Sequence, residues 1–212
     1  MDGLEAVGAA VTRRLDAKFA AREVGLANAR QATRRCANAV RACHRSELER
    51  ADALIAEARE LLDGAESALA PHPDVYYTGF VQDAQKEYAE AVLTRAIVAG
   101  QALPGPDGMG VPDVPWLGGL ADAIGELRRH TLDLLRAGQV ARATEVFATM
   151  DELQGLLAGI DYPDAMTGGL RRLTDVARSI VERTRGDLTL SAVQRDLADA
   201  LRADHDAAAG DA

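Results

Sequence analysis

Strand signals are nearly absent from this chain of 212 residues. No stretch alternates apolar and polar residues with enrichment in valine, isoleucine and aromatics, and no Asn-Gly or Asp-Gly turn separates two such stretches. Apolar residues recur instead at helical spacing, and the longest predicted helix covers residues 4–45. We therefore predict an all-α protein, an antiparallel bundle of about six to seven helices.

Cap and turn residues divide the chain into these helices. Ser46 and Glu49 have the spacing of a capping box, which predicts a second helix from residue 46 to 69. Further helices are predicted at 79–99, 116–137, 139–158 and 165–185, with a short last helix from Thr189 or Ser191 to residue 202. Four prolines and four glycines mark residues 100–115 as a loop. We predict one domain over residues 1–203 and a flexible tail over 204–212.

Composition sets further bounds on the fold and the location of the protein. Alanine accounts for 42 residues, which favours helices packed closely through small side chains. This composition also leaves open that an apolar stripe is buried against another subunit rather than within the monomer. The chain has no run of about 18 apolar residues, the length that a membrane-spanning helix needs. Its N-terminus lacks the pattern of a signal peptide, so we expect a cytoplasmic protein with no membrane partner. Cys36 and Cys43 lie too far apart on one predicted helix for a disulfide.

Two pairs of acidic residues lie at helical spacing. Glu87 and Glu90 are three residues apart, and Asp122 and Glu126 are four apart, so each pair is expected on one face of its helix. Like charges at these spacings repel, and carboxylates without histidine or cysteine are the oxygen ligands that Mg²⁺ or Mn²⁺ prefers. Acids at such spacing are also usual on solvated helix faces. The spacing alone therefore leaves both interpretations open.

Basic residues are concentrated near the N-terminus. The net charge of −9 argues against a general nucleic-acid binder, but residues 10–50 carry +6 and residues 51–212 carry −13. Part of the excess forms a line along one side of the predicted first helix, which we call the basic stripe. Its members are Arg30, Arg34, Arg41 and Arg45, with His44 beside them. Such a stripe fits a phosphate backbone, or it pairs with acidic residues of this chain or of a second subunit.

Three stretches of the chain resemble the translin and translin-associated factor X family, in the order and spacing of that family. They are YTGFVQDAQKEYAEA at 77–91, WLGGLADAIGELRR at 116–129 and LRRLTDVARSIVERTRGDL at 170–188. The resemblance covers nearly the whole chain. It implies an all-helical protomer of about seven helices that assembles into a hollow oligomer, commonly an octamer, and binds RNA or single-stranded DNA inside the shell.

The resemblance also implies chemistry, because the two branches of the family differ. Translin itself chiefly binds nucleic acid, whereas the associated-factor branch is a Mg²⁺-dependent endoribonuclease. The glutamates of the EYxEA motif of that branch match Glu87 and Glu90, and the acids of its DxxGE motif match Asp122 and Glu126. All four carboxylates are present, which favours the catalytic branch.

Our first hypothesis is therefore an endoribonuclease that uses Mg²⁺ or Mn²⁺. The four carboxylates would hold the metal, a metal-activated water would attack the phosphodiester, and the basic stripe would bind the RNA backbone. The alternatives are a shell that binds RNA or single-stranded DNA without cleaving it, an all-α nucleoside triphosphate pyrophosphatase, and a scaffold whose long helices only dimerise.

Overall fold

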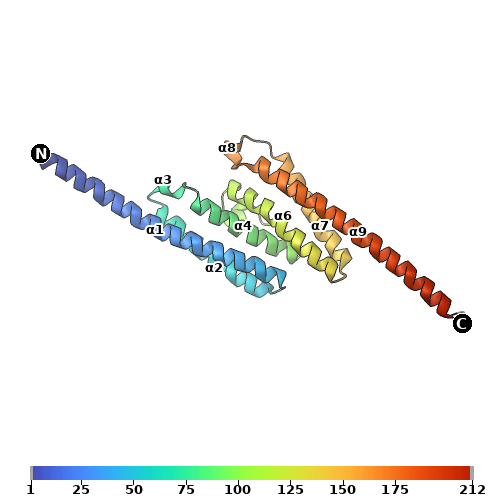
Figure 1. Ribbon diagram of the computed structural model, residues 1–212. Coiled ribbons are helices and arrows are strands. Elements are labelled where there is room, and N and C mark those ends of the chain that lie inside the picture. Colours follow the sequence, from blue (N-terminus) through green and yellow to red (C-terminus); the bar gives the residue numbers. More distant parts are fainter. Residues whose placement is uncertain (1, 211–212) are drawn as a thin grey trace. The chain divides into compact units, whose positions relative to one another are not determined.

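The computed structural model describes residues 2–210, and side chains within them except those of residues 2, 204 and 207–210. The described residues form nine helices and no strand (Figure 1), which confirms the all-α prediction. The helices are α1 (Asp2–His44), α2 (Leu48–Leu69), α3 (Pro73–Tyr76), α4 (Phe80–Val98), α5 (Pro106–Met109), α6 (Asp113–Arg136), α7 (Val140–Gly159), α8 (Asp164–Thr167) and α9 (Leu170–Gly210). Among these described helices, none combines the length and the apolar character that a membrane span requires.

The chain divides into two compact units, Met1–Leu120 and Ala121–Ala212. The first contains α1 to α5 and the start of α6, and the second contains the rest of α6 with α7, α8 and α9. The single domain predicted over residues 1–203 thus contains a boundary between units, and this boundary falls inside α6.

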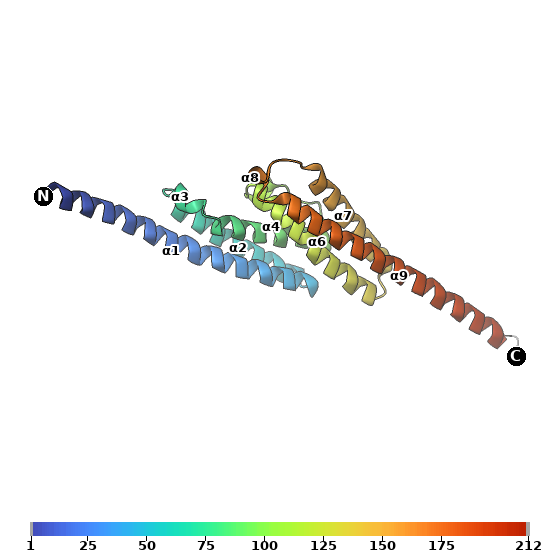
Figure 2. The same cartoon turned by 45° about the horizontal axis from the view of Figure 1, so that its top comes forward.

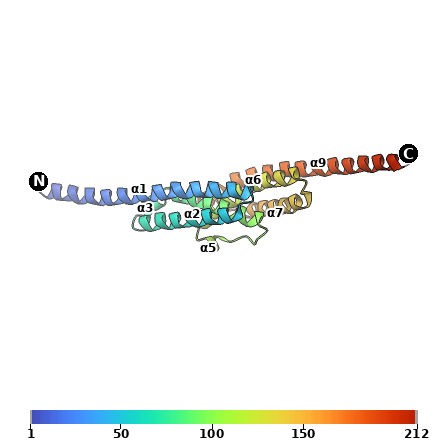
Figure 3. The same ribbon diagram turned by 90° about the horizontal axis from the view of Figure 1, so that it is seen from below.

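Three long helices form the first unit. Gly25 of α1 lies against Leu69 of α2, and Arg35 is ion-paired with Glu57 at 2.7 Å, so α2 runs antiparallel along the second half of α1. Helix α4 packs on both of them. The loop that carries α5 lies beside α2 (Figure 3), where the Arg59 guanidinium donates to the Gly110 carbonyl at 3.3 Å.

The core of this unit is built largely from alanine. Buried alanines on α1, α2 and α4 let the helix backbones approach closely, as the composition predicted. They include Ala29, Ala32, Ala39, Ala42, Ala51, Ala58, Ala65, Ala84, Ala89 and Ala91. Larger side chains fill one end of the unit, where Leu69, Val75 and Val81 form a buried cluster.

The second unit is arranged around α9. Helix α7 packs beside it (Figure 2), and Arg185 of α9 is ion-paired with Asp151 of α7 at 2.8 Å. On α6, Arg128 donates to the Thr184 hydroxyl at 3.0 Å and is ion-paired with Asp187 at 2.8 Å. The apolar face of α7 is buried and consists of Ala143, Val146, Met150, Leu153 and Leu157.

The C-terminal part of the chain differs from the prediction. The helix predicted at 165–185 and the short helix after it are one continuous helix, α9. Thr189, which we expected to cap a new helix, donates its hydroxyl to the Arg185 carbonyl at 2.9 Å, a bond that lies within a helix. The stretch assigned to a flexible tail is helical as far as Gly210, and residues 211 and 212 lie outside the described part.

The start of α2 also differs from the prediction. Glu47 is the N-cap residue and no side chain caps the helix, so the expected capping box of Ser46 and Glu49 is wrong. Ser46 belongs to the end of α1 and has a left-handed φ of 60°. Its amide donates to the Cys43 carbonyl and the Glu47 amide donates to the Ala42 carbonyl, both at 2.9 Å, which is the bond pair of a Schellman motif.

Replacing Ser46 with glycine is expected to raise the free energy of unfolding by about 1 kcal/mol, because a left-handed backbone is strained for every residue except glycine. Urea unfolding followed by circular dichroism measures the change. Gly138 has the same position after α6, with φ 73°, so Gly138→Ser should lower the free energy of unfolding by a similar amount. An unchanged stability of Ser46→Gly would contradict this explanation.

Candidate functional site

The first acidic pair lies in the middle of α4. Glu87 and Glu90 are both half-buried, and each offers a carboxylate oxygen within 4.8 Å of the other. Tyr88 and Ala89 between them are buried, so this turn of α4 is fixed by packing on both sides of the acids. The structure therefore brings the two predicted glutamates together.

A buried thiol and a lysine lie near the pair. Cys36 of α1 is buried and free, as is Cys43. Burial raises the pKa of the Cys36 thiol to about 12, with the charges of Glu87 and Glu90 as the next causes, so the pair lies close to this part of α1. The Lys86 ammonium approaches Glu87 at 3.8 Å.

Helix α6 packs against the same turn of α4 through two glycines. A Cβ atom on Gly119 would lie 2.6 Å from the Ala89 Cβ and 2.7 Å from both the Glu90 amide nitrogen and the Lys86 carbonyl oxygen. A Cβ on Gly118 would lie 2.9 Å from the Lys86 side chain. The helix backbones are thus in contact directly beside the acidic pair, a role that sequence analysis did not assign although the Gly-Gly doublet was visible.

Gly125, which lies between Asp122 and Glu126 on the same helix, has no such close contact. A Cβ on Gly125 would meet only the Ile180 Cδ1, at 4.0 Å, which is an ordinary van der Waals contact within the second unit. The neighbouring residues therefore leave enough room for a methyl group at Gly125.

The second acidic pair lies on the part of α6 that belongs to the second unit. Asp122 and Glu126 are both half-buried and are separated by about one helical turn, as the spacing predicted. Buried Ala123, Ile124 and Leu127 occupy the other side of this stretch. The face that carries the two acids is thus the more open side of the helix.

All four arginines of the basic stripe are exposed, and His44 is half-buried. Arg45 is ion-paired with Glu47 at 2.7 Å, and Arg41 donates to the Asn38 side chain at 2.8 Å. Within the described residues, Arg30 and Arg34 have no ion pair. The expectation that the arginines pair with acids of the same chain thus holds for Arg45 and not for Arg30 or Arg34.

The basic stripe and the acidic pair on α4 do not share one face. The buried residues of α1, such as Ala32, Cys36 and Ala39, lie on the side where α2 and α4 pack, and the stripe lies on the opposite side. The first unit therefore does not join the arginines and Glu87 with Glu90 into one compact site.

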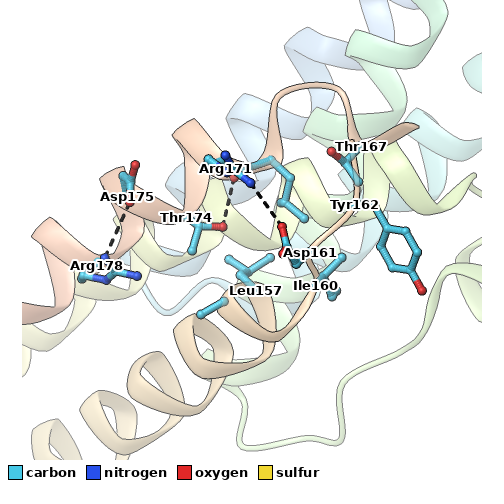
Figure 4. A pocket seen from close by; sticks show the side chains of 11 residues that line it. Leu157, Ile160, Asp161, Tyr162, Thr167, Arg171, Thr174, Asp175 and Arg178 are labelled. Carbon is cyan, nitrogen blue, oxygen red and sulfur yellow. Dashed lines mark hydrogen bonds and ion pairs between the residues drawn. The ribbon is translucent and has the colours of Figure 1, made fainter. Parts of the chain in front are cut away.

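A cavity of about 240 Å³ lies in the second unit, between the end of α7 and the start of α9. Figure 4 shows its polar wall, where Arg171 is ion-paired with Asp161 at 3.2 Å and Arg178 with Asp175 at 3.7 Å. Because each arginine that lines the cavity has a carboxylate partner, the wall has no excess charge to select an ion. We do not assign a ligand to this cavity.

The chain is similar to one protein of known sequence and to three solved structures. An uncharacterized protein of Methanocaldococcus jannaschii is 30% identical over 174 residues, which cover 81% of this chain and 76% of that protein. The crystal structure of C3PO from Archaeoglobus is 30% identical with a TM-score of 0.79, over 87% of this chain and 96% of that one. A second structure of that protein, in complex with duplex RNA, is 29% identical with a TM-score of 0.78, over 87% of this chain and 96% of that one. The crystal structure of apo-NeC3PO shares the fold, with a TM-score of 0.75 and 18% identity over 87% of this chain and 96% of that one. No family model matches the sequence.

Proposed function

This chain belongs to the translin family, and we propose that it binds RNA and cleaves it as a Mg²⁺- or Mn²⁺-dependent endoribonuclease within a homo-oligomer. The observation that carries the proposal is the acidic pair on α4, where Glu87 and Glu90 are half-buried with carboxylate oxygens within 4.8 Å of each other. Two like charges held this close favour a bound cation, because a cation offsets their repulsion.

The donor atoms fit a hard cation. Glu87 and Glu90 offer only oxygen, and the nearby Cys36 stays a neutral thiol because its pKa is raised to about 12. Oxygen ligands without thiolate or imidazole suit Mg²⁺ and Mn²⁺ rather than zinc. When bound, such an ion polarises a phosphoryl oxygen and lowers the pKa of water.

We propose that Asp122 and Glu126 complete the set of ligands. Helix α6 is continuous from Asp113 to Arg136, and its Gly119 is packed on the α4 backbone at Glu90. Asp122 follows Gly119 by about one turn of the same helix. The match of both acidic motifs to those of the catalytic branch of the family supports Asp122 and Glu126 as ligands.

The exposed arginines of the stripe would bind the RNA backbone away from the cleaved bond. Arg30 and Arg34 support this role, because neither has an ion pair within the described residues and guanidinium groups bind phosphates through paired hydrogen bonds. Contacts of this kind give affinity with little preference for base sequence. A protein that binds in this way is expected to act on many RNA sequences.

The purified protein is expected to cleave single-stranded RNA with Mg²⁺, to lose this activity in EDTA, and to regain it when Mg²⁺ or Mn²⁺ is restored. Labelled RNA on denaturing gels measures cleavage, with duplex RNA of the same sequence beside it because the Archaeoglobus relative forms a complex with duplex RNA. Cleavage that persists in EDTA would exclude the metal-dependent reaction. Salt-sensitive binding without turnover would instead identify a non-catalytic binding protein.

Replacing both Arg30 and Arg34 with alanine is expected to weaken RNA binding at all sequences and to flatten its salt dependence. The slope of log K against log salt should fall by about 0.7 for each lost phosphate contact. Fluorescence anisotropy across a salt series measures this slope. The matched control is Arg35→Ala, since Arg35 lies on the same helix but is ion-paired with Glu57 at 2.7 Å. Equal slopes for the double variant and the wild type would remove the stripe from the RNA-binding surface.

A further inference from the structure

Arg59 of α2 lies where three elements of the first unit meet. Its guanidinium donates to the carbonyls of Gly110 and Met109, at 3.3 and 3.5 Å, where α5 ends. The central carbon of the guanidinium lies 5.5 Å from the centre of the Tyr88 ring on α4, which is a cation–π contact. Glu66 of α2 is ion-paired with the same guanidinium at 2.9 Å. One half-buried side chain thus joins α2, the end of α5 and α4.

Buried hydrogen bonds link this contact to the turn of α4 that carries the acidic pair. Glu66 also accepts a bond from the side-chain amide of Gln85 on α4 at 2.9 Å, and Gln85 is only 1% exposed. Gln85 precedes Glu87 by two residues, and Tyr88 follows Glu87 directly. The contacts of Arg59 therefore reach α4 on both sides of the first acid.

The loop that carries α5, residues 99–112, leads directly into α6, and we call it the α5 loop. Only two residues separate Gly110 from Asp113, the first residue of α6. The indole nitrogen of Trp116 on α6 donates to the Pro104 carbonyl at 3.1 Å, so the helix is also bonded to an earlier part of the loop. A displacement of the α5 loop would therefore displace the start of α6.

The start of α6 in turn packs on the turn of α4 that carries the acidic pair. At Gly119 the backbone of α6 lies against the Glu90 amide and the Lys86 carbonyl, and at Gly118 it lies against the Lys86 side chain. If the α5 loop is released, these backbones can separate, and the glutamates lose the support of α6. Loss of a group that supports a metal ligand lowers metal affinity by roughly 10- to 100-fold.

We propose that Arg59 is a positioning residue, which holds the α5 loop so that the start of α6 stays packed on the turn with Glu87 and Glu90. It is not itself a metal ligand and acts through the packing at Gly119. Arginine suits this role better than lysine, because its planar group has five donors and can bond to carbonyls and a carboxylate while it lies over a ring. This inference rests on the metal site of the proposed function.

Arg59→Lys tests the proposal, since lysine keeps the charge and can pair with Glu66, but its single nitrogen cannot also hold the loop. Trp116 is the only tryptophan of the sequence, so its fluorescence reports on the start of α6. Its emission should shift to longer wavelength, and acrylamide should quench it more strongly than in the wild type. The Kd for Mn²⁺, measured by electron paramagnetic resonance without RNA, should rise by about 10-fold. Arg59→Gln also removes the charge and should show both effects at least as strongly.

Arg185→Gln is the matched control, because Arg185 makes the same kinds of contact in the second unit. It is ion-paired with Asp151 at 2.8 Å, and its guanidinium lies 4.9 Å from the centre of the Phe147 ring. This variant should keep the wild-type emission and the wild-type Kd for Mn²⁺.

The proposal is overturned if Arg59→Lys keeps the wild-type emission, or if its emission changes while the Kd for Mn²⁺ does not. An equal rise of the Kd in Arg185→Gln would also overturn it, since the effect would then be a general loss of stability. If Arg59→Gln does not fold by circular dichroism, Arg59→Lys alone decides. A wild type that binds no Mn²⁺ would instead overturn the proposed metal site, and the positioning role with it.

Discussion

Replacing Glu87 with glutamine should reduce RNA cleavage by more than about 100-fold, because loss of a residue that only supports a metal ligand already costs 10- to 100-fold. Glutamine has the size of glutamate and keeps one oxygen, but it lacks the charge that offsets a divalent cation. RNA binding by this variant should be as tight as wild type or tighter, since a negative charge is removed. Initial rates on labelled RNA and anisotropy measure the two effects separately.

Asp83→Asn is the matched control for Glu87→Gln. Asp83 is an exposed acid one turn earlier on α4, so its replacement removes the same charge from the same helix without touching the half-buried pair. This variant should cleave RNA at nearly the wild-type rate. Equal rates for the two variants, high or low, would show that Glu87 has no special role and that the cleavage has another origin.

Replacing Gly119 with alanine should lower the free energy of unfolding by about 3 kcal/mol, at the upper end of the usual cost of overpacking. The new methyl group would lie 2.7 Å from the Glu90 amide nitrogen and the Lys86 carbonyl oxygen, and backbone atoms cannot move aside as a flexible side chain can. The helices α4 and α6 would have to separate at the acidic pair. We therefore also expect reduced cleavage at temperatures where this variant is still folded.

Gly125→Ala provides the comparison on the same helix. Its methyl group would lie 4.0 Å from Ile180 Cδ1, so it fits without a clash. Alanine favours a helix over glycine by about 1 kcal/mol, so this variant should be as stable as wild type or more stable. Thermal unfolding of both variants measures the difference, and an equal loss of stability in the two would contradict the packing seen at Gly119.

Helical spacing predicted the long helices well because it depends on residues that are close in sequence. The ends of helices were harder to predict, because a polar side chain can satisfy the backbone in more than one way. Thr189 bonds to a carbonyl within α9 instead of capping a new helix, and Ser46 adopts a left-handed conformation at the end of α1. Both residues are common caps, and only the surrounding structure decides which role they take.

The proximity of Glu87 and Glu90 followed from their spacing on one helix. The roles of the glycines did not, since Gly119 and Gly125 lie in similar sequence surroundings and differ only in what packs against them. The partners of the arginines were also beyond sequence analysis. Neighbouring Arg34 and Arg35 differ because only Arg35 lies within reach of Glu57 on α2.

The alanine core also affects how an ion would be captured. Alanine has no side-chain rotamers to lose, so the helices around α4 are held together at little cost in side-chain entropy. The buried Tyr88 and Ala89 also hold in place the backbone that carries Glu87 and Glu90. Preorganisation of this kind raises affinity without new contacts. Replacing one of these alanines with valine would push the helices around α4 apart. It would thereby weaken cation binding even though both glutamates remain.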